Sequence, residues 1–416
     1  MLEDGTFFLG ISCGALGEAC GEICFNTSLV GYVESISDPS YAGQIVNMTY
    51  PQIGNYGVAH ADMQADHLHL KGVVVRDMCY TPSNFRSDES LPELLTRQGV
   101  VAIENIDTRH LTRHIRDAGA MRAILSTVDT NPTSLLEKVR ASAALDAQNL
   151  AATVSTPESY LYQDWEKIHD FALKTPQPER YHVVAYDCGI KKGILRNLRR
   201  VGCRVTVVPW DTPADDVIAL DPDGIFFSNG PGDPQPVTAS IEAARQLFGK
   251  FPIFGICLGQ QMIGLCAGAS IEKLKFGHRG GNQPVMNLRT HRVEITAQNH
   301  SFGIVFPSLG ALLPQESGGI DSHPNDLRFW VENGIAPVVS SKSHGRIQLT
   351  HVNLNDGTPE GLAFLDAPTF CVQYHPEAGP GPTDSHYLFD AFTRLMDGRQ
   401  DYLDIDITQD RLAEWR

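Results

Sequence analysis

Cys257 lies where an apolar run, FPIFGI, meets a helix-like pattern, LGQQMIGLCAG. This order predicts a buried strand that ends at the cysteine and a helix that begins after it. Gly255 and Gly259 suit a tight strand-to-helix turn. The positive end of the helix dipole at such a turn favours the thiolate form of the side chain. The spacing therefore indicates a nucleophile, with a buried structural cysteine as the alternative.

A thiol nucleophile needs a base, and the base gains from a carboxylate that orients it. The stretch FCVQYHPEAGPG supplies His375 and Glu377, which face the same side if the preceding strand continues through them. The loop SNGPGDP at 228–234 carries two glycines whose backbone N–H groups suit an oxyanion hole. A solvated strand end and a plain turn are the alternatives for these two segments.

The elements around these residues predict a parallel sheet. Apolar strands are expected at HVVAYDCG, CRVTVVPW, DGIFF and FPIFGI, with amphipathic helices between them. Continuous apolar strands that alternate with helices are typical of a doubly wound sheet covered on both faces. Ligands of such sheets bind beyond the carboxyl ends of the strands, where Cys257 is expected.

The pattern along the whole chain predicts two domains with different arrangements of strands and helices. We predict a mixed α/β domain over 1–150, with a helix through VAIENIDTRHLTRHIRDAG that Gly119 ends, and a linker over 151–180. The α/β domain of the sheet then spans 181–416. Within it, a Gly-, Ser- and Pro-rich segment at 304–345 is expected to be an inserted surface loop.

Composition excludes several classes of protein. Asp and Glu outnumber Lys and Arg, 49 to 33, and the net charge of −16 argues against a nucleic-acid or acidic-lipid surface. Nine scattered cysteines indicate a reducing compartment, and none has the spacing of a zinc site, so no metal is expected. There is no apolar run of the ~20 residues that a membrane helix needs. The N-terminus resembles no targeting signal, so we expect a cytoplasmic protein.

GICLGQQ, SNGPGDP and QYHPEAGPG, in that order, resemble a class I glutamine amidotransferase domain. FNTSLVGYVESISDPSYAGQIVNMTYPQIGNYG and NIDTRHLTRHIRDAGAMRAIL resemble the N-terminal domain of the small, glutamine-hydrolysing chain of carbamoyl-phosphate synthase. FGHRGGNQPV and ITAQNHSF resemble later segments of the same family. The amidotransferase motifs alone would also admit anthranilate-, GMP- or CTP-forming enzymes.

The resemblance implies a role for each matching residue. Cys257 would form a γ-glutamyl thioester, with His375 as general acid and base and Glu377 orienting it. The remaining residues would bind the substrate or its oxyanion: Ser40, Gly230, Gly232, Leu258, Gln261, Asn299, Ser301 and Phe302. Ser301 departs from the pattern, which usually has glycine at this position.

The resemblance also implies a partner. A large synthetase subunit would use the ammonia, ATP, Mg²⁺ and bicarbonate to make carbamoyl phosphate for arginine or pyrimidine biosynthesis, and this chain itself would hold no cofactor. The alternatives are a catalytically weak regulatory or scaffold paralogue, another amidotransferase subunit, and a free-standing γ-glutamyl hydrolase that would leave the N-terminal domain unexplained.

Overall fold

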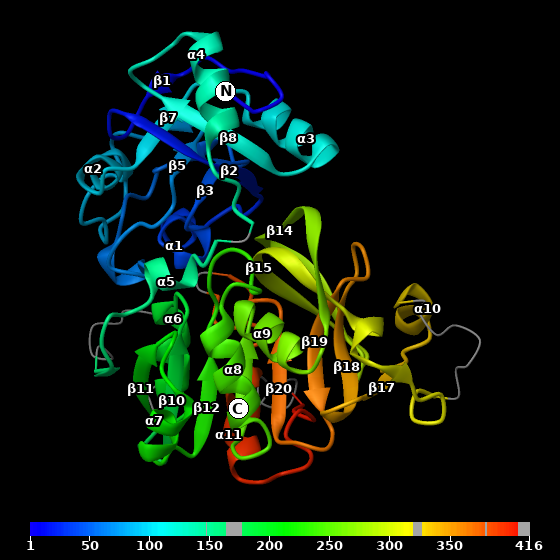
Figure 1. Ribbon diagram of the computed structural model, residues 1–416. Helices are drawn as coiled ribbons and strands as arrows, with labels where there is room; N and C mark the ends of the chain where they lie inside the picture. The colour runs from blue at the N-terminus through cyan, green and yellow to red at the C-terminus, as the bar shows by residue number, and fades with distance from the viewer. Residues whose placement is uncertain (147, 164–176, 319–326, 379–380, 407–416) are drawn as a thin grey trace.

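The computed structural model describes the chain except for residues 147, 164–176, 319–326, 379–380 and 407–416. Figure 1 shows two α/β domains, the N-terminal one in blue and cyan and the C-terminal one in green to red. The predicted fold class is confirmed, because helices alternate with strands and the central strands of both sheets are largely parallel. Among the described helices, none combines the length and apolar character of a bilayer span.

The N-terminal domain is built on a six-stranded sheet with the order β1-β7-β5-β3-β2-β8. Its strands are β1 Ile11–Ser12, β2 Glu18–Asn26, β3 Gln44–Met48, β5 Gly72–Val74, β7 Val101–Glu104 and β8 Met121–Ser126, and a separate pair joins β4 Gln52–Ile53 to β6 Asp77–Met78. Its helices are α1 Tyr32–Ile36, α2 Leu91–Arg97, α3 Thr108–Ala118 and α4 Pro132–Ala141, with short 3-10 turns at Pro39–Tyr41 and His60–Asp62.

The helix predicted over 101–119 is half correct. Helix α3 begins after Asp107, whose carboxylate accepts a hydrogen bond from the backbone N–H of His110 at 2.9 Å, and ends at Gly119. Gly119 has a φ of 104°, which favours glycine. Residues 101–104 instead form strand β7, because these β-branched and apolar residues pair with β5 in the sheet interior.

The C-terminal domain has a parallel centre in the order β11-β10-β12-β13-β20. Adjacent residues along β10 and β12 point to opposite cores: Val184 and Ile225 pack with α8 and α9, whereas Val183 and Phe226 pack with α6 and α11. The sheet is therefore doubly wound, as predicted. Its elements are β10 Tyr181–Asp187, α6 Lys192–Arg200, β11 Cys203–Pro209, α7 Ala214–Ala219, β12 Gly224–Phe227, α8 Thr238–Leu247, β13 Ile253–Ile256, α9 Leu258–Cys266, β20 Thr369–Val372 and α11 Tyr387–Met396.

Antiparallel strands extend this sheet and connect it to the N-terminal domain. Strands β14, Ser270–Asn287, and β15, Arg292–Val305, form a long hairpin that rises toward the N-terminal domain in Figure 1. Strand β14 contacts β2 and α3 there. The hairpin pairs onward through β18 Gly345–Asn353 and β19 Pro359–Phe364 to β20.

Two segments differ from expectation. In the region assigned to a linker, α5 Ala151–Val154 is followed by β9 Tyr160–Leu161, which pairs with β11 and adds an edge strand to the large sheet. The inserted segment is not a plain surface loop: after the 3-10 turn Phe306–Leu309, it forms β16 Ala311–Leu312, α10 Leu327–Glu332 and β17 Val338–Ser341, which pairs with β18. Trp330 is 1% exposed and packs edge-on against Phe306, so apolar burial holds this segment to the core.

Candidate active site

Cys257 occupies a strained turn between β13 and α9. Its φ of 56° and ψ of −104° are unusual for a residue with a side chain. A Cβ added to Gly259 would lie 2.1 Å from the carbonyl oxygen of Phe227, and one added to Gly255 would lie 2.5 Å from Ile263. Both glycines are therefore required by close packing, and the turn presents the cysteine at the carboxyl end of the sheet.

His375, Glu377 and Lys191 form a buried chain of charges beside this turn. His375 Nδ1 lies 2.7 Å from Glu377 Oε1, and Lys191 Nζ contacts the same oxygen at 2.8 Å. Strand β20 ends at Val372, so the histidine and glutamate meet in a loop that follows the strand, where Pro376 lies. His375 Nε2 is buried and has no hydrogen-bond partner among the described residues, which leaves it available to the thiol.

The charges of this group set its protonation. Burial raises the pKa of Glu377, but Lys191 and His375 outweigh it and lower that pKa to about 2. Burial and Lys191 lower the pKa of His375, but Glu377 and Cys257 outweigh them and raise it to about 10. At neutral pH the carboxylate is ionised and the imidazole holds a proton, which is the arrangement of a base that has taken a proton from a thiol.

A small cavity, here called the Cys257 cavity, opens in front of the nucleophile. Seven of the sequence-predicted site residues line it, together with three that were not predicted. The lining residues are Ser40, Gln44, Gly230, Gly232, Cys257, Gln261, Arg279, Asn299, His300 and Ser301.

Two further predicted residues, Leu258 and Phe302, do not line the cavity but contact residues that do. Leu258 is the first residue of α9, where backbone N–H groups have no partner within the helix. A Cβ on Gly230 would lie 2.6 Å from the Leu258 side chain, so these two residues adjoin. The carbonyl oxygen of Phe302 accepts a 2.8 Å hydrogen bond from Gln261 Nε2, which ties β15 to α9.

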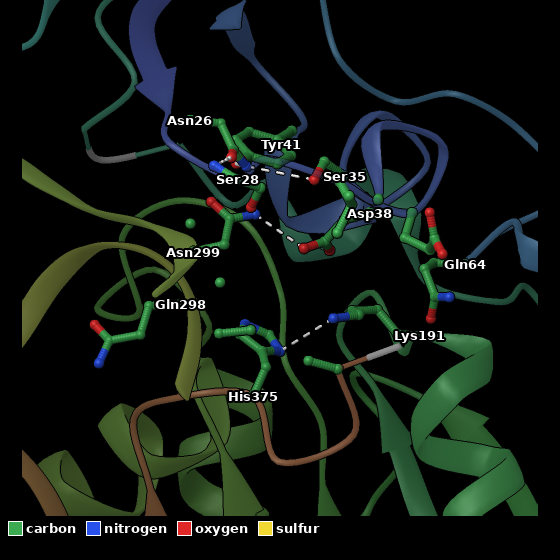
Figure 2. Close-up of a pocket in the computed structure, with 17 residues that line it drawn as sticks. Asn26, Ser28, Ser35, Asp38, Tyr41, Gln64, Lys191, Gln298, Asn299 and His375 are labelled. Carbon is green, nitrogen blue, oxygen red and sulfur yellow. Dashed lines mark hydrogen bonds between the residues drawn. The ribbon is translucent and has the colours of Figure 1, made fainter. Parts of the chain in front are cut away.

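The N-terminal domain supplies part of the site. The Asp38 carboxylate accepts hydrogen bonds from the Ser40 backbone N–H and from Asn299 Nδ2, both at 2.9 Å. The Ser40 hydroxyl in turn accepts a 2.9 Å hydrogen bond from Asn229 Nδ2. Figure 2 shows Asp38 and Asn299 meeting above Lys191 and His375, in a second cavity between the domains. Residues from both domains therefore fix the position of Asn299.

Ser301 needs no glycine-like backbone. Its φ is not among the positive values of the described chain, and its position lies within strand β15. The hydroxyl accepts hydrogen bonds from Arg279 Nη2 and from Gln44 Nε2, the latter at 3.3 Å. A side chain is therefore accommodated at this position, and it has specific partners.

Sequence reasoning missed Lys191, Gln44, Arg279 and His300. Lys191 follows the carboxyl end of β10 and is 8% exposed, so the rule that ligands gather at this edge would have indicated it. Arg279 and His300 stand inside the quoted segments FGHRGGN and QNHSF. Gln44 opens β3, and no local pattern distinguishes it.

Comparison with known proteins identifies both domains. Residues 1–125 match the carbamoyl-phosphate synthase small chain, CPSase domain, and residues 184–395 match the class-I glutamine amidotransferase domain. The chain belongs to the carbamoyl-phosphate synthase small chain family. The carbamoyl phosphate synthase small chain of Syntrophotalea carbinolica is 47% identical over 95% of this chain and 96% of its own length. That of Thermotoga maritima is 45% identical over 95% of this chain and 97% of its own length.

One of the similar solved structures aligns with part of the chain. It is a putative GMP synthase component from Thermoplasma acidophilum, 18% identical, which covers 55% of this chain and all of its own, with a TM-score of 0.39. The resemblance to the small-chain family, inferred above from motifs, is confirmed by the relatives that match almost the whole chain.

Proposed function

We propose that Cys257, His375 and Glu377 hydrolyse glutamine in this chain. As a member of its family with a class I amidotransferase domain, the chain is the glutamine-hydrolysing subunit of carbamoyl-phosphate synthase. The observation that carries the residue assignment is the buried His375–Glu377 pair beside a cysteine held at a φ of 56°.

The chemistry follows from the groups present. His375 first takes the proton of the Cys257 thiol, and the resulting thiolate then attacks the side-chain amide carbon of glutamine. The backbone N–H groups of Leu258 and Gly230 stabilise the oxyanion of the tetrahedral intermediate. Its collapse breaks the C–N bond, and His375 returns the proton to the departing ammonia. Water then attacks the γ-glutamyl thioester, which releases glutamate and restores the thiol.

The substrate is assigned to the Cys257 cavity. Gln261, Gly232 and Ser301 line it together with the nucleophile, and Asn299 and Ser40 come from facing domains. Gly232 has a φ of 79°, which allows its backbone to turn into the cavity. Phe302, through its backbone, holds the strand that carries Asn299.

The partner proposed for this chain is the large subunit of carbamoyl-phosphate synthase. It would receive the ammonia and combine it with bicarbonate, using ATP and Mg²⁺. The thiol and imidazole of this chain need no cofactor for hydrolysis, so the nucleotide and metal are assigned to the partner. We place the complex in the cytoplasm, which the nine free cysteines support.

The test measures glutamate release from glutamine by the wild-type chain and by Cys257→Ala, each alone and with the large subunit, ATP and bicarbonate. We expect slow release by the wild-type chain alone, faster release in the complex, and none from the variant. Release that persists in Cys257→Ala, or none from the wild type in any condition, would favour a regulatory or scaffold role.

A further inference from the structure

Arg279 brings a positive charge into the Cys257 cavity. It lies on strand β14, where it pairs with Asn299 of β15 between two register shifts of the hairpin. It is 3% exposed and lines the cavity together with Cys257. Its Nη1 donates a 2.7 Å hydrogen bond to the carbonyl oxygen of Phe276, and its Nη2 donates to the Ser301 hydroxyl. Its Nε is buried and has no partner in the described chain.

The guanidinium has only neutral partners. Neither acceptor is charged, and no described carboxylate forms an ion pair with it. A buried cation without a counter-charge is costly, and buried arginines are therefore normally paired. Burying the Arg279 charge without a counter-charge therefore costs free energy in the free chain, and a bound anion would offset that cost.

Nearby acidic groups are committed to other partners. Glu22 forms an ion pair with Lys273 at 2.7 Å and accepts a hydrogen bond from Gln44. Asp38 accepts its hydrogen bonds from Ser40 and Asn299. The cavity's uncompensated charge is therefore positive.

The other ionisable group on the wall besides the nucleophile is His300. Burial and the charge of His278 hold the pKa of His300 well below its usual value, so its imidazole is neutral. Arg279 is thus the permanently charged side chain among the described residues that line the cavity.

We propose that Arg279 binds the α-carboxylate of the substrate glutamine. The inference rests on the proposed function and extends it: Cys257 engages the side-chain amide at one end of the cavity, and the guanidinium engages the carboxylate at the other. A planar guanidinium matches a carboxylate with two parallel hydrogen bonds, and its free Nε is one donor for them. The site then selects free glutamine over glutamine whose carboxylate is part of an amide.

The test compares glutamine with glutaminamide, in which the α-carboxylate is a neutral carboxamide, using the complex with the large subunit. Arg279→Gln should raise the KM for glutamine by roughly 10- to 100-fold, with a smaller change in kcat. The same variant should leave kcat/KM for glutaminamide nearly unchanged, so the preference for glutamine collapses. Arg279→Lys keeps the positive charge and should retain part of the preference for glutamine over glutaminamide.

Lys273→Gln is the matched control, because Lys273 is a nearby cation that already has carboxylate partners. It should leave the preference for glutamine over glutaminamide intact. Carbamoyl phosphate synthesis from free ammonia reports whether each variant complex is folded. An equal loss on both substrates in Arg279→Gln, or no loss, would overturn the assignment.

A binding measurement separates this inference from the proposed function. In a Cys257→Ala background, calorimetry should detect glutamine binding that Arg279→Gln weakens by a similar factor. If the wild type proves unable to hydrolyse glutamine but this binding difference persists, the proposed function fails and the inference stands. If hydrolysis is normal and Arg279→Gln does not change the affinity for glutamine, the role of Arg279 is wrong and the proposed function stands.

Discussion

Two buried cations flank the nucleophile, and their surroundings differ. Lys191 lies on the base side of the site, 2.8 Å from the Glu377 carboxylate, whereas Arg279 lies on the substrate side with a carbonyl and a hydroxyl as acceptors. Burial lowers the pKa of Lys191, but Glu377 and Asp38 outweigh it and raise that pKa, so the lysine stays charged. Lys191, whose charge is balanced by Glu377, shifts the pKa values of the proposed catalytic groups. Arg279, which has no counter-charge among the described residues, is suited to bind an anionic ligand.

Replacing Glu377 should give the largest effect on the base side. Glu377→Gln removes the negative charge that orients and protonates His375 and leaves Lys191 without its partner. We expect kcat for glutamine to fall by roughly 10²- to 10⁴-fold with little change in KM. Steady-state kinetics of the complex would check this, and unchanged synthesis from ammonia would show that the fold is intact. A loss seen mainly in KM would contradict the division between the two sides.

Replacing Lys191 should have a smaller effect and a distinctive pH dependence. Lys191 lowers the pKa values of both His375 and Glu377, so Lys191→Met should move both upward. Both limbs of the plot of kcat against pH should therefore shift to higher pH, because one pKa unit corresponds to a tenfold change in proton affinity. Neutral pH lies between the two limbs, so kcat there should change by less than about tenfold. Arg279→Gln, measured in parallel, should leave the limbs in place; a shift in that variant would link the two sides.

The smallest effect is expected at Ser301, which supports Arg279. Ser301→Ala removes one acceptor of the guanidinium but leaves its charge in the cavity. The KM for glutamine should rise by about two- to tenfold, the range for one hydrogen bond. Substrate titration of the complex would measure it, and an effect as large as that of Arg279→Gln would mean that the hydroxyl itself contacts the substrate.

The sequence predicted the turn around Cys257 well because its determinants are local. An apolar strand, two glycines and a helix follow one another within about fifteen residues. The glycines have a direct steric reason, such as the 2.1 Å contact that a side chain at Gly259 would make. The alternation of apolar strands and helices after residue 181 likewise predicted the doubly wound sheet.

Contacts between residues that are distant in the sequence could not be predicted in this way. Lys191 and Glu377 are 186 residues apart, and Arg279 meets Gln44 only through Ser301, across the boundary between domains. Helix propensity misassigned residues 101–104, because pairing with β5 overrode it. The inserted segment was misjudged from its Gly, Ser and Pro content, although Trp330 anchors it in the core.

The carboxylate of Asp38 links the two domains. It accepts one hydrogen bond from Ser40 in the N-terminal domain and another from Asn299 in the amidotransferase domain. The amidotransferase domain alone would carry an intact nucleophile and an incomplete pocket. In evolutionary terms, the N-terminal domain is then part of the proposed substrate site. Gene fusion or fission that separated the halves would have to preserve this contact or replace it.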